Sequence, residues 1–102
     1  MTLNKSFIIE TISKNISQIQ RFGVLKIGLF GSYVKDRGNP DSDIDLLVEL
    51  NPDETNYDNY FDLIEFLESL FHTKVEVVTI DSLSPYIGPY ILEEVEYIES
   101  AA

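Results

Sequence analysis

Two apolar, strand-like runs joined by a short polar stretch constrain the fold of this chain more than any other feature. Residues 24–30 are apolar enough to form a buried strand, and Gly31 and Ser32 end it in a tight turn. A second strand-like run covers residues 43–50, and ten residues separate Ser32 from Asp43. This spacing lets the two strands lie next to each other, with the glycine turn beside the start of the second strand.

The residues at this junction have a specific chemistry. Glycine lets the backbone come close to a phosphate, while the following amides and the Ser32 hydroxyl can donate hydrogen bonds to it. Asp43 and Asp45 are two positions apart in a strand, so their side chains leave the same face, and two converging carboxylates suit Mg²⁺. In an acidic chain such a pair also occurs as exposed acids at a strand start. The flanking apolar strands and the glycine turn favour a phosphate and metal site.

Glu76 is a charged residue between Val75 and Val77 in a β-branched run over residues 74–80. If this third strand pairs beside the second, Glu76 points to the same place as the two aspartates; otherwise it is an exposed residue on an edge strand. As a third carboxylate it would help to hold a catalytic ion and take the proton from an attacking hydroxyl. Phosphoryl transfer with two metal ions needs several such acids.

The remaining pattern predicts a compact α/β fold, with a short mixed sheet flanked by helices. Isoleucines at helical spacing predict a helix over residues 4–21, and a second apolar set predicts another over 57–71. A third helical segment is expected from Ser84 through Ile98. Arg37 lies in the polar loop after the glycine turn, where it either neutralises a triphosphate oxygen or serves solubility.

Size and composition limit the function. With 102 residues, the chain is expected to form a single domain over residues 1–102, without room for a separate substrate-binding domain. It has no cysteine, no apolar run long enough to cross a membrane and no signal-peptide pattern, so we expect a soluble cytoplasmic protein.

The charge is uneven along the chain. The net charge is −11, because residues 1–37 carry +4 and residues 38–102 carry −15. Such an acidic surface repels a phosphate backbone, which argues against direct binding of nucleic acid. It serves either solubility or the recognition of a basic partner protein.

The segment from Leu29 to Ser32, with Ser42 to Val48, strongly resembles the minimal nucleotidyltransferases of the DNA-polymerase-β-like superfamily. The resemblance implies the small nucleotidyltransferase fold of that superfamily. It also implies that Gly31 and Ser32 contact the phosphates of ATP, and that Asp43 and Asp45 bind divalent metal. Glu76 is the best match to the third family carboxylate, which is often Asp. Relatives often carry an Arg-Gly pair soon after the glycine turn, and here Arg37 and Gly38 lie a little further along.

Stand-alone family members of this size look like antitoxins of HEPN-domain RNase toxins, which they silence by transferring AMP from ATP to a toxin tyrosine. The resemblance therefore implies a protein adenylyltransferase that uses Mg²⁺, with two ions expected, and a HEPN-domain toxin as partner. Two alternatives stay open. One is an antitoxin that blocks its toxin by binding alone, and the other is a nucleotidyltransferase that acts on a small molecule.

Overall fold

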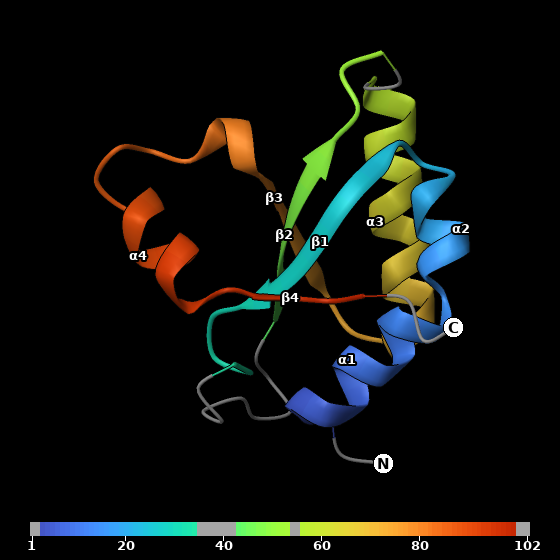
Figure 1. Ribbon diagram of the computed structural model, residues 1–102. Helices are drawn as coiled ribbons and strands as arrows, with labels where there is room; N and C mark the ends of the chain where they lie inside the picture. The colour runs from blue at the N-terminus through green and yellow to red at the C-terminus, as the bar shows by residue number, and fades with distance from the viewer. Residues whose placement is uncertain (1–2, 35–42, 54–55, 100–102) are drawn as a thin grey trace.

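A four-stranded mixed sheet organises the protein (Figure 1). The computed structural model describes residues 3–34, 43–53 and 56–99. The strands are β1 (Val24–Phe30), β2 (Ile44–Leu50), β3 (Val75–Thr79) and β4 (Glu96–Tyr97). The helices are α1 (Lys5–Lys14), α2 (Ile16–Gln20), α3 (Tyr57–Phe71), α4 (Gly88–Glu94) and the short 3-10 helix η1 (Ile80–Ser82). The expected fold class, a short mixed sheet flanked by helices, is confirmed.

The strand order in the sheet is β3-β2-β1-β4. β1 runs antiparallel to both β2 and β4, whereas β2 and β3 are parallel and are connected through α3. Because β1 and β2 point in opposite directions, the end of β1 lies beside the start of β2, and the start of β3 lies on the other side of β2. One end of the sheet therefore collects residues from three strands.

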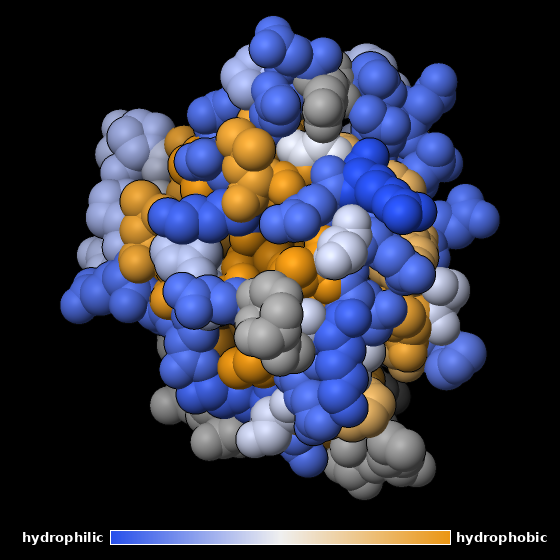
Figure 2. All heavy atoms as spheres, turned by 45° about the vertical axis from the view of Figure 1, so that its right-hand side comes forward, coloured by the Kyte–Doolittle hydropathy of each residue, from blue (hydrophilic) through white to orange (hydrophobic). Residues whose placement is uncertain are grey.

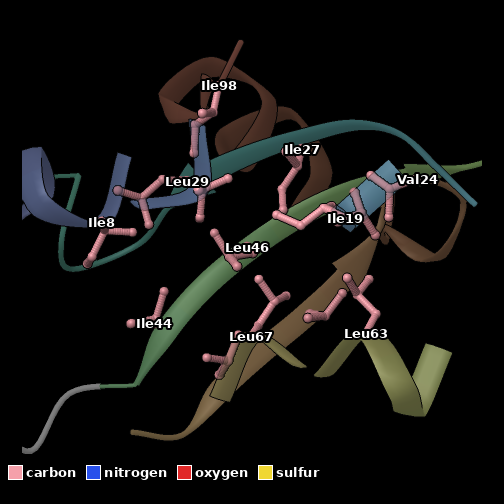
Figure 3. Close-up of a cluster of buried hydrophobic side chains, with 14 of the residues drawn as sticks. Ile8, Ile19, Val24, Ile27, Leu29, Ile44, Leu46, Leu63, Leu67 and Ile98 are labelled. Atoms are coloured by element: carbon pink, nitrogen blue, oxygen red, sulfur yellow. The ribbon is translucent and has the colours of Figure 1, made fainter. Parts of the chain in front are cut away.

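The hydrophobic core fills the space between one face of the sheet and the layer formed by α1, α2 and α3. Figure 3 shows side chains from β1, from β2 and from α3 pointing toward one another. They include Ile27, Leu29, Ile44, Leu46, Leu63 and Leu67, none of which exposes more than 1% of its surface. Side chains alternate along a strand, so the residues between these core positions face the other side of the sheet.

Side chains of α3 protect the outer edge of β3. The Tyr60 hydroxyl donates a hydrogen bond of 2.6 Å to the Val77 carbonyl, and the Val75 amide donates one of 3.1 Å to Glu68 Oε2. An unprotected edge strand exposes backbone groups that invite pairing with another chain. These contacts also fix β3 against α3, and with it Glu76.

The helix predicted over residues 4–21 is interrupted at Asn15, where the structure has α1 and α2 instead. The backbone of Asn15 leaves helical geometry (φ −110°, ψ 14°), and its side-chain amide donates to the Thr11 carbonyl at 2.8 Å. Such local side-chain bonds compete with a regular helix. Gly23, at φ 88°, lies in the turn between α2 and β1.

The prediction of one helical segment from Ser84 through Ile98 was wrong. α4 ends at Glu94, Val95 is extended, and Glu96 and Tyr97 form β4. The edge of β1 provides backbone partners for this stretch, and the Ile98 amide donates to the Ile27 carbonyl at 2.9 Å. Isoleucine and valine suit a strand as well as a helix, so the available sheet edge decides the outcome.

The surface is largely hydrophilic on the face that Figure 2 shows, with hydrophobic side chains visible in a central area and in smaller areas toward both sides. A hollow on the molecule is lined by residues of α2, β1 and the C-terminal segment, among them Ile16, Val24 and Ile98.

Within the described residues, no helix is both long and apolar enough to cross a membrane.

Candidate functional site

Asp45 and Glu76 meet on neighbouring strands, on the sheet face away from the core. In the sheet register, Asp45 of β2 lies opposite Phe30 of β1 on one side and Glu76 of β3 on the other. Figure 3 shows its neighbours Ile44 and Leu46 pointing into the core, so Asp45 points the opposite way. The Asp45 and Glu76 carboxyl groups form a hydrogen bond. The structure thus brings together two of the three predicted carboxylates as the sequence suggested.

Gly31 forms the turn directly after β1 and presses against Asp45. Its φ of +81° is a conformation that residues with a side chain rarely adopt. A Cβ placed on Gly31 would lie 2.3 Å from Asp45 Oδ2 and 3.2 Å from Asp45 Cβ. Only glycine therefore allows the turn to approach the aspartate this closely.

Asp43 and Ser32 are half-buried residues at the same end of the sheet. Asp43 precedes β2, and its charge is among those that act on Asp45. Ser32 follows Gly31 in the turn. Arg37 lies outside the described residues.

Glu94 is a site residue that the sequence analysis missed. It is the last residue of α4, and its Oε1 accepts a hydrogen bond of 3.2 Å from the Gly31 amide. The charge of Glu94 also acts on Asp45. Nothing in its sequence context distinguishes it from the neighbouring acids Glu93 and Glu96, because only the pairing of β4 with β1 brings it to the turn.

Three other acidic side chains act on Asp45. Burial, followed by the hydrogen bond and the negative charge of Glu76, raises the pKa of Asp45 to about 6. The charges of Asp43 and Glu94 act in the same direction. Asp45 therefore holds its proton more tightly than an exposed aspartate, and a group of carboxylates of this kind attracts cations.

The acidic side chains near Asp45 are of a chemical type that suits Mg²⁺. Carboxylate oxygens are the ligands that this cation prefers. Asp45 and Glu76 lie side by side in the sheet, and a divalent cation is one way to neutralise two adjacent carboxylates. In the part of the chain that the structure describes, no three acidic or histidine side chains are arranged as a group that could hold a metal ion.

His72 lies at the end of α3 and has a structural role there. It ends α3 with a left-handed backbone (φ 54°), and its amide donates to the Glu68 carbonyl at 2.8 Å. A left-handed residue at this position is a common way to end a helix.

Known proteins similar to this chain are nucleotidyltransferases. The sequence model of the nucleotidyltransferase domain family matches residues 9–98. The protein adenylyltransferase MntA of Thermococcus cleftensis is 39% identical over 79 residues, which cover 78% of this chain and 79% of that protein.

Two solved structures are similar in fold. One, described provisionally as a minimal nucleotidyltransferase, has a TM-score of 0.74 and 26% identity, and the similarity covers 90% of this chain and 89% of that chain. The other is a tri-AMPylated HEPN toxin of Shewanella oneidensis in complex with its MNT antitoxin. It has a TM-score of 0.61 and 20% identity, with 94% of this chain and 72% of that chain covered.

Proposed function

Because this chain belongs to the nucleotidyltransferase domain family and is homologous to the protein adenylyltransferases, we propose that it is an antitoxin that transfers AMP from ATP to a tyrosine of a HEPN-domain toxin. The proposal takes residues 1–102 as one minimal nucleotidyltransferase domain in the cytoplasm. The observation that carries it is the meeting of Asp45, Glu76 and the Gly31 turn at one end of the sheet.

The roles of the residues follow from their chemistry. The turn at Gly31 and Ser32 offers backbone amides and a hydroxyl to the phosphates of ATP. Asp43, Asp45 and Glu76 would hold Mg²⁺, with two ions expected. The metal supplies neutralisation of the charge that develops on the triphosphate. Arg37, outside the described residues, would neutralise a further triphosphate oxygen.

In the proposed reaction, the acceptor hydroxyl oxygen forms a new bond to the α-phosphorus of ATP. The bond from that phosphorus to the bridging oxygen of the β-phosphate breaks, and pyrophosphate leaves with the bonding electrons. Glu76, which is exposed and adjacent to Asp45 in the sheet, accepts the hydroxyl proton. Most of the rate enhancement comes from positioning the reactants and from stabilising charge.

Three observations support a protein as the acceptor. The Shewanella oneidensis complex contains an AMPylated HEPN toxin. Residues 38–102 carry −15, which favours a basic protein partner over nucleic acid. Large apolar side chains around α4 are also exposed, namely Tyr86, Ile87 and Tyr90 at 82%, 59% and 73%. Exposed tyrosines of this kind are common in protein interfaces.

Intact-mass spectrometry of the HEPN-domain partner tests the proposal. The partner is incubated with this protein, ATP and Mg²⁺, and mass increments of AMP are expected. The double variant Asp43→Asn/Asp45→Asn should give none. The matched control Asp62→Asn/Glu65→Gln removes the same charge from the exposed face of α3, and it should label the partner like the unmodified protein.

The outcomes separate the alternatives. A stable complex without any mass increment would favour an antitoxin that acts by binding alone. Full labelling by the Asp43/Asp45 variant would show that these carboxylates do not form the catalytic site. Peptide mapping of the labelled partner then identifies the acceptor residue, and a residue other than tyrosine would correct that part of the proposal.

A further inference from the structure

Glu94 accepts a hydrogen bond from a backbone amide of the turn that the proposed function assigns to the phosphates of ATP. The Gly31 amide donates to Glu94 Oε1 at 3.2 Å, and Gly31 belongs to the turn that would bind the triphosphate. A carboxylate oxygen and a phosphate oxygen are both anionic acceptors, so one amide proton does not serve both at full strength.

The sheet register explains why Glu94 is there. β4 pairs with β1 so that Glu96 lies opposite Leu29 and Tyr97 lies opposite Gly28. Val95 is extended and joins β4 to Glu94, the last residue of α4, so this pairing brings the end of α4 close to the Gly31 turn. The pairing of β4 therefore places the Glu94 backbone near the turn, and the Glu94 side chain then reaches the Gly31 amide.

The local charge makes this position significant. Glu94 approaches a site that already contains Asp43, Asp45 and Glu76, and its charge acts on Asp45. A carboxylate in such surroundings is repelled by its neighbours and by any phosphate that enters. The Gly31 amide gives it a favourable contact only while the phosphate is absent.

We propose that Glu94 occupies the phosphate-binding amide of Gly31 in the nucleotide-free protein and thereby lowers the affinity for ATP. Glu94 thus competes with the substrate for this amide. ATP binding must displace its carboxylate from the turn. The inference rests on the proposed function, because it assigns the triphosphate to the Gly31 turn.

Equilibrium binding of α,β-methylene ATP, which cannot release pyrophosphate, tests this without any catalytic step. Titration calorimetry compares the unmodified full chain with Glu94→Gln and Glu93→Gln, in Mg²⁺ and in EDTA, at physiological ionic strength. Glu94→Gln should bind about fivefold to tenfold more tightly in both conditions, since one like charge is removed next to a phosphate oxygen. Glu93→Gln removes the same charge from an exposed neighbour and should change the affinity by less than about twofold.

The Gly31 amide resonance in an NMR spectrum provides a second readout. In the nucleotide-free protein, Glu94→Ala should shift this resonance and Glu93→Ala should leave it in place. An unmoved resonance in Glu94→Ala would overturn the proposed contact, whether or not nucleotide binds.

The binding data distinguish the remaining possibilities. Weaker binding by Glu94→Gln in Mg²⁺ but not in EDTA would mean that Glu94 is a metal ligand, and it would overturn the inference. Unchanged binding by Glu94→Gln would overturn it as well. Absence of binding by all three proteins would instead refute the proposed function, together with the inference that rests on it.

Discussion

Replacing Gly31 with alanine should damage the site through Asp45. A residue with a side chain at φ +81° carries about 1–2 kcal/mol of backbone strain. In addition, the new Cβ would lie 2.3 Å from Asp45 Oδ2, so that this oxygen must move by about 0.7 Å even to reach the 3.0 Å limit of real contacts. Rotating the aspartate relieves the contact with Oδ2 only, because the Asp45 Cβ would still lie 3.2 Å from the new methyl group and must itself move by a few tenths of an ångström.

The expected cost is therefore larger than strain alone. Overpacking of this kind adds about 1–3 kcal/mol, so Gly31→Ala should lower the free energy of unfolding by about 2–5 kcal/mol. Gly23→Ala is the matched control, because Gly23 has a similar φ of 88° and lies at the opposite end of β1. It should lose only the strain, about 1–2 kcal/mol.

Urea denaturation at 25 °C gives both free energies, and a single-turnover assay of AMP transfer gives the rate. Moving Asp45 by about 1 Å should slow the transfer about 100-fold in Gly31→Ala, whereas Gly23→Ala should retain its rate. When Asp45 is also replaced by alanine, Gly31→Ala should lower the free energy of unfolding by an amount closer to that of Gly23→Ala, because the side chain that it contacts is shortened. Equal losses of stability in the two glycine variants would refute the contact between Gly31 and Asp45.

Three further predictions concern the stability of the protein without nucleotide or metal. Asp45→Asn should raise the free energy of unfolding at pH 7 by about 1 kcal/mol. The half-buried carboxyl group has a pKa of about 6 in the folded protein, against an ordinary value of 3.8, so its charged form destabilises the fold at pH 7. The full linkage energy of this shift is about 3 kcal/mol, and solvent screening reduces it. Because the pKa is raised in the folded protein, protonated Asp45 stabilises the fold below pH 4, and this contribution is lost as the pH rises through 6. In urea titrations, the higher free energy of unfolding of Asp45→Asn should therefore disappear below pH 4. A variant less stable than the unmodified protein at pH 7 would contradict this. Tyr60→Phe should cost about 1 kcal/mol by removing the hydrogen bond to the Val77 carbonyl, whereas Tyr57→Phe, at a tyrosine that is 81% exposed, should show no loss in the same titration. His72→Gly should raise the melting temperature, with a gain of about 1 kcal/mol, because glycine adopts the left-handed backbone without strain; a lower melting temperature would argue against that conformation.

Most of the local structure could be predicted from the sequence because local patterns encode it. The run over 24–30 became β1, the predicted helix over 57–71 became α3, and the strand over 74–80 appears as Val75–Thr79. α3 has a helical periodicity that matches one buried face, whereas the two strands are marked by apolar or β-branched runs. The segment from Ser84 to Ile98 was different, because its apolar residues are compatible with either a helix or a strand.

The site could be predicted in part for the same reason. Asp45, Glu76 and Gly31 belong to strands and to a turn that the sequence marks clearly, so their meeting required only that the strands pair in the expected order. The catalytic, nucleotide-binding and metal roles assigned to these residues stay predictions. Glu94 was missed because it contacts a residue 63 positions away in the sequence, and only the pairing of β4 with β1 brings the two together.

The sequence by itself determined the strand and helix periodicities, the glycine at the turn and the carboxylates that follow it, because each depends on neighbours close in the chain. Only the tertiary structure decided that residues 96–97 leave the helical pattern and pair with β1, because the free edge of that strand offers hydrogen bonds that no local pattern encodes. That pairing carries Glu94 to the Gly31 amide. The acidic environment of Asp45, and with it the raised pKa, is therefore a property of the assembled sheet and not of any segment of the chain.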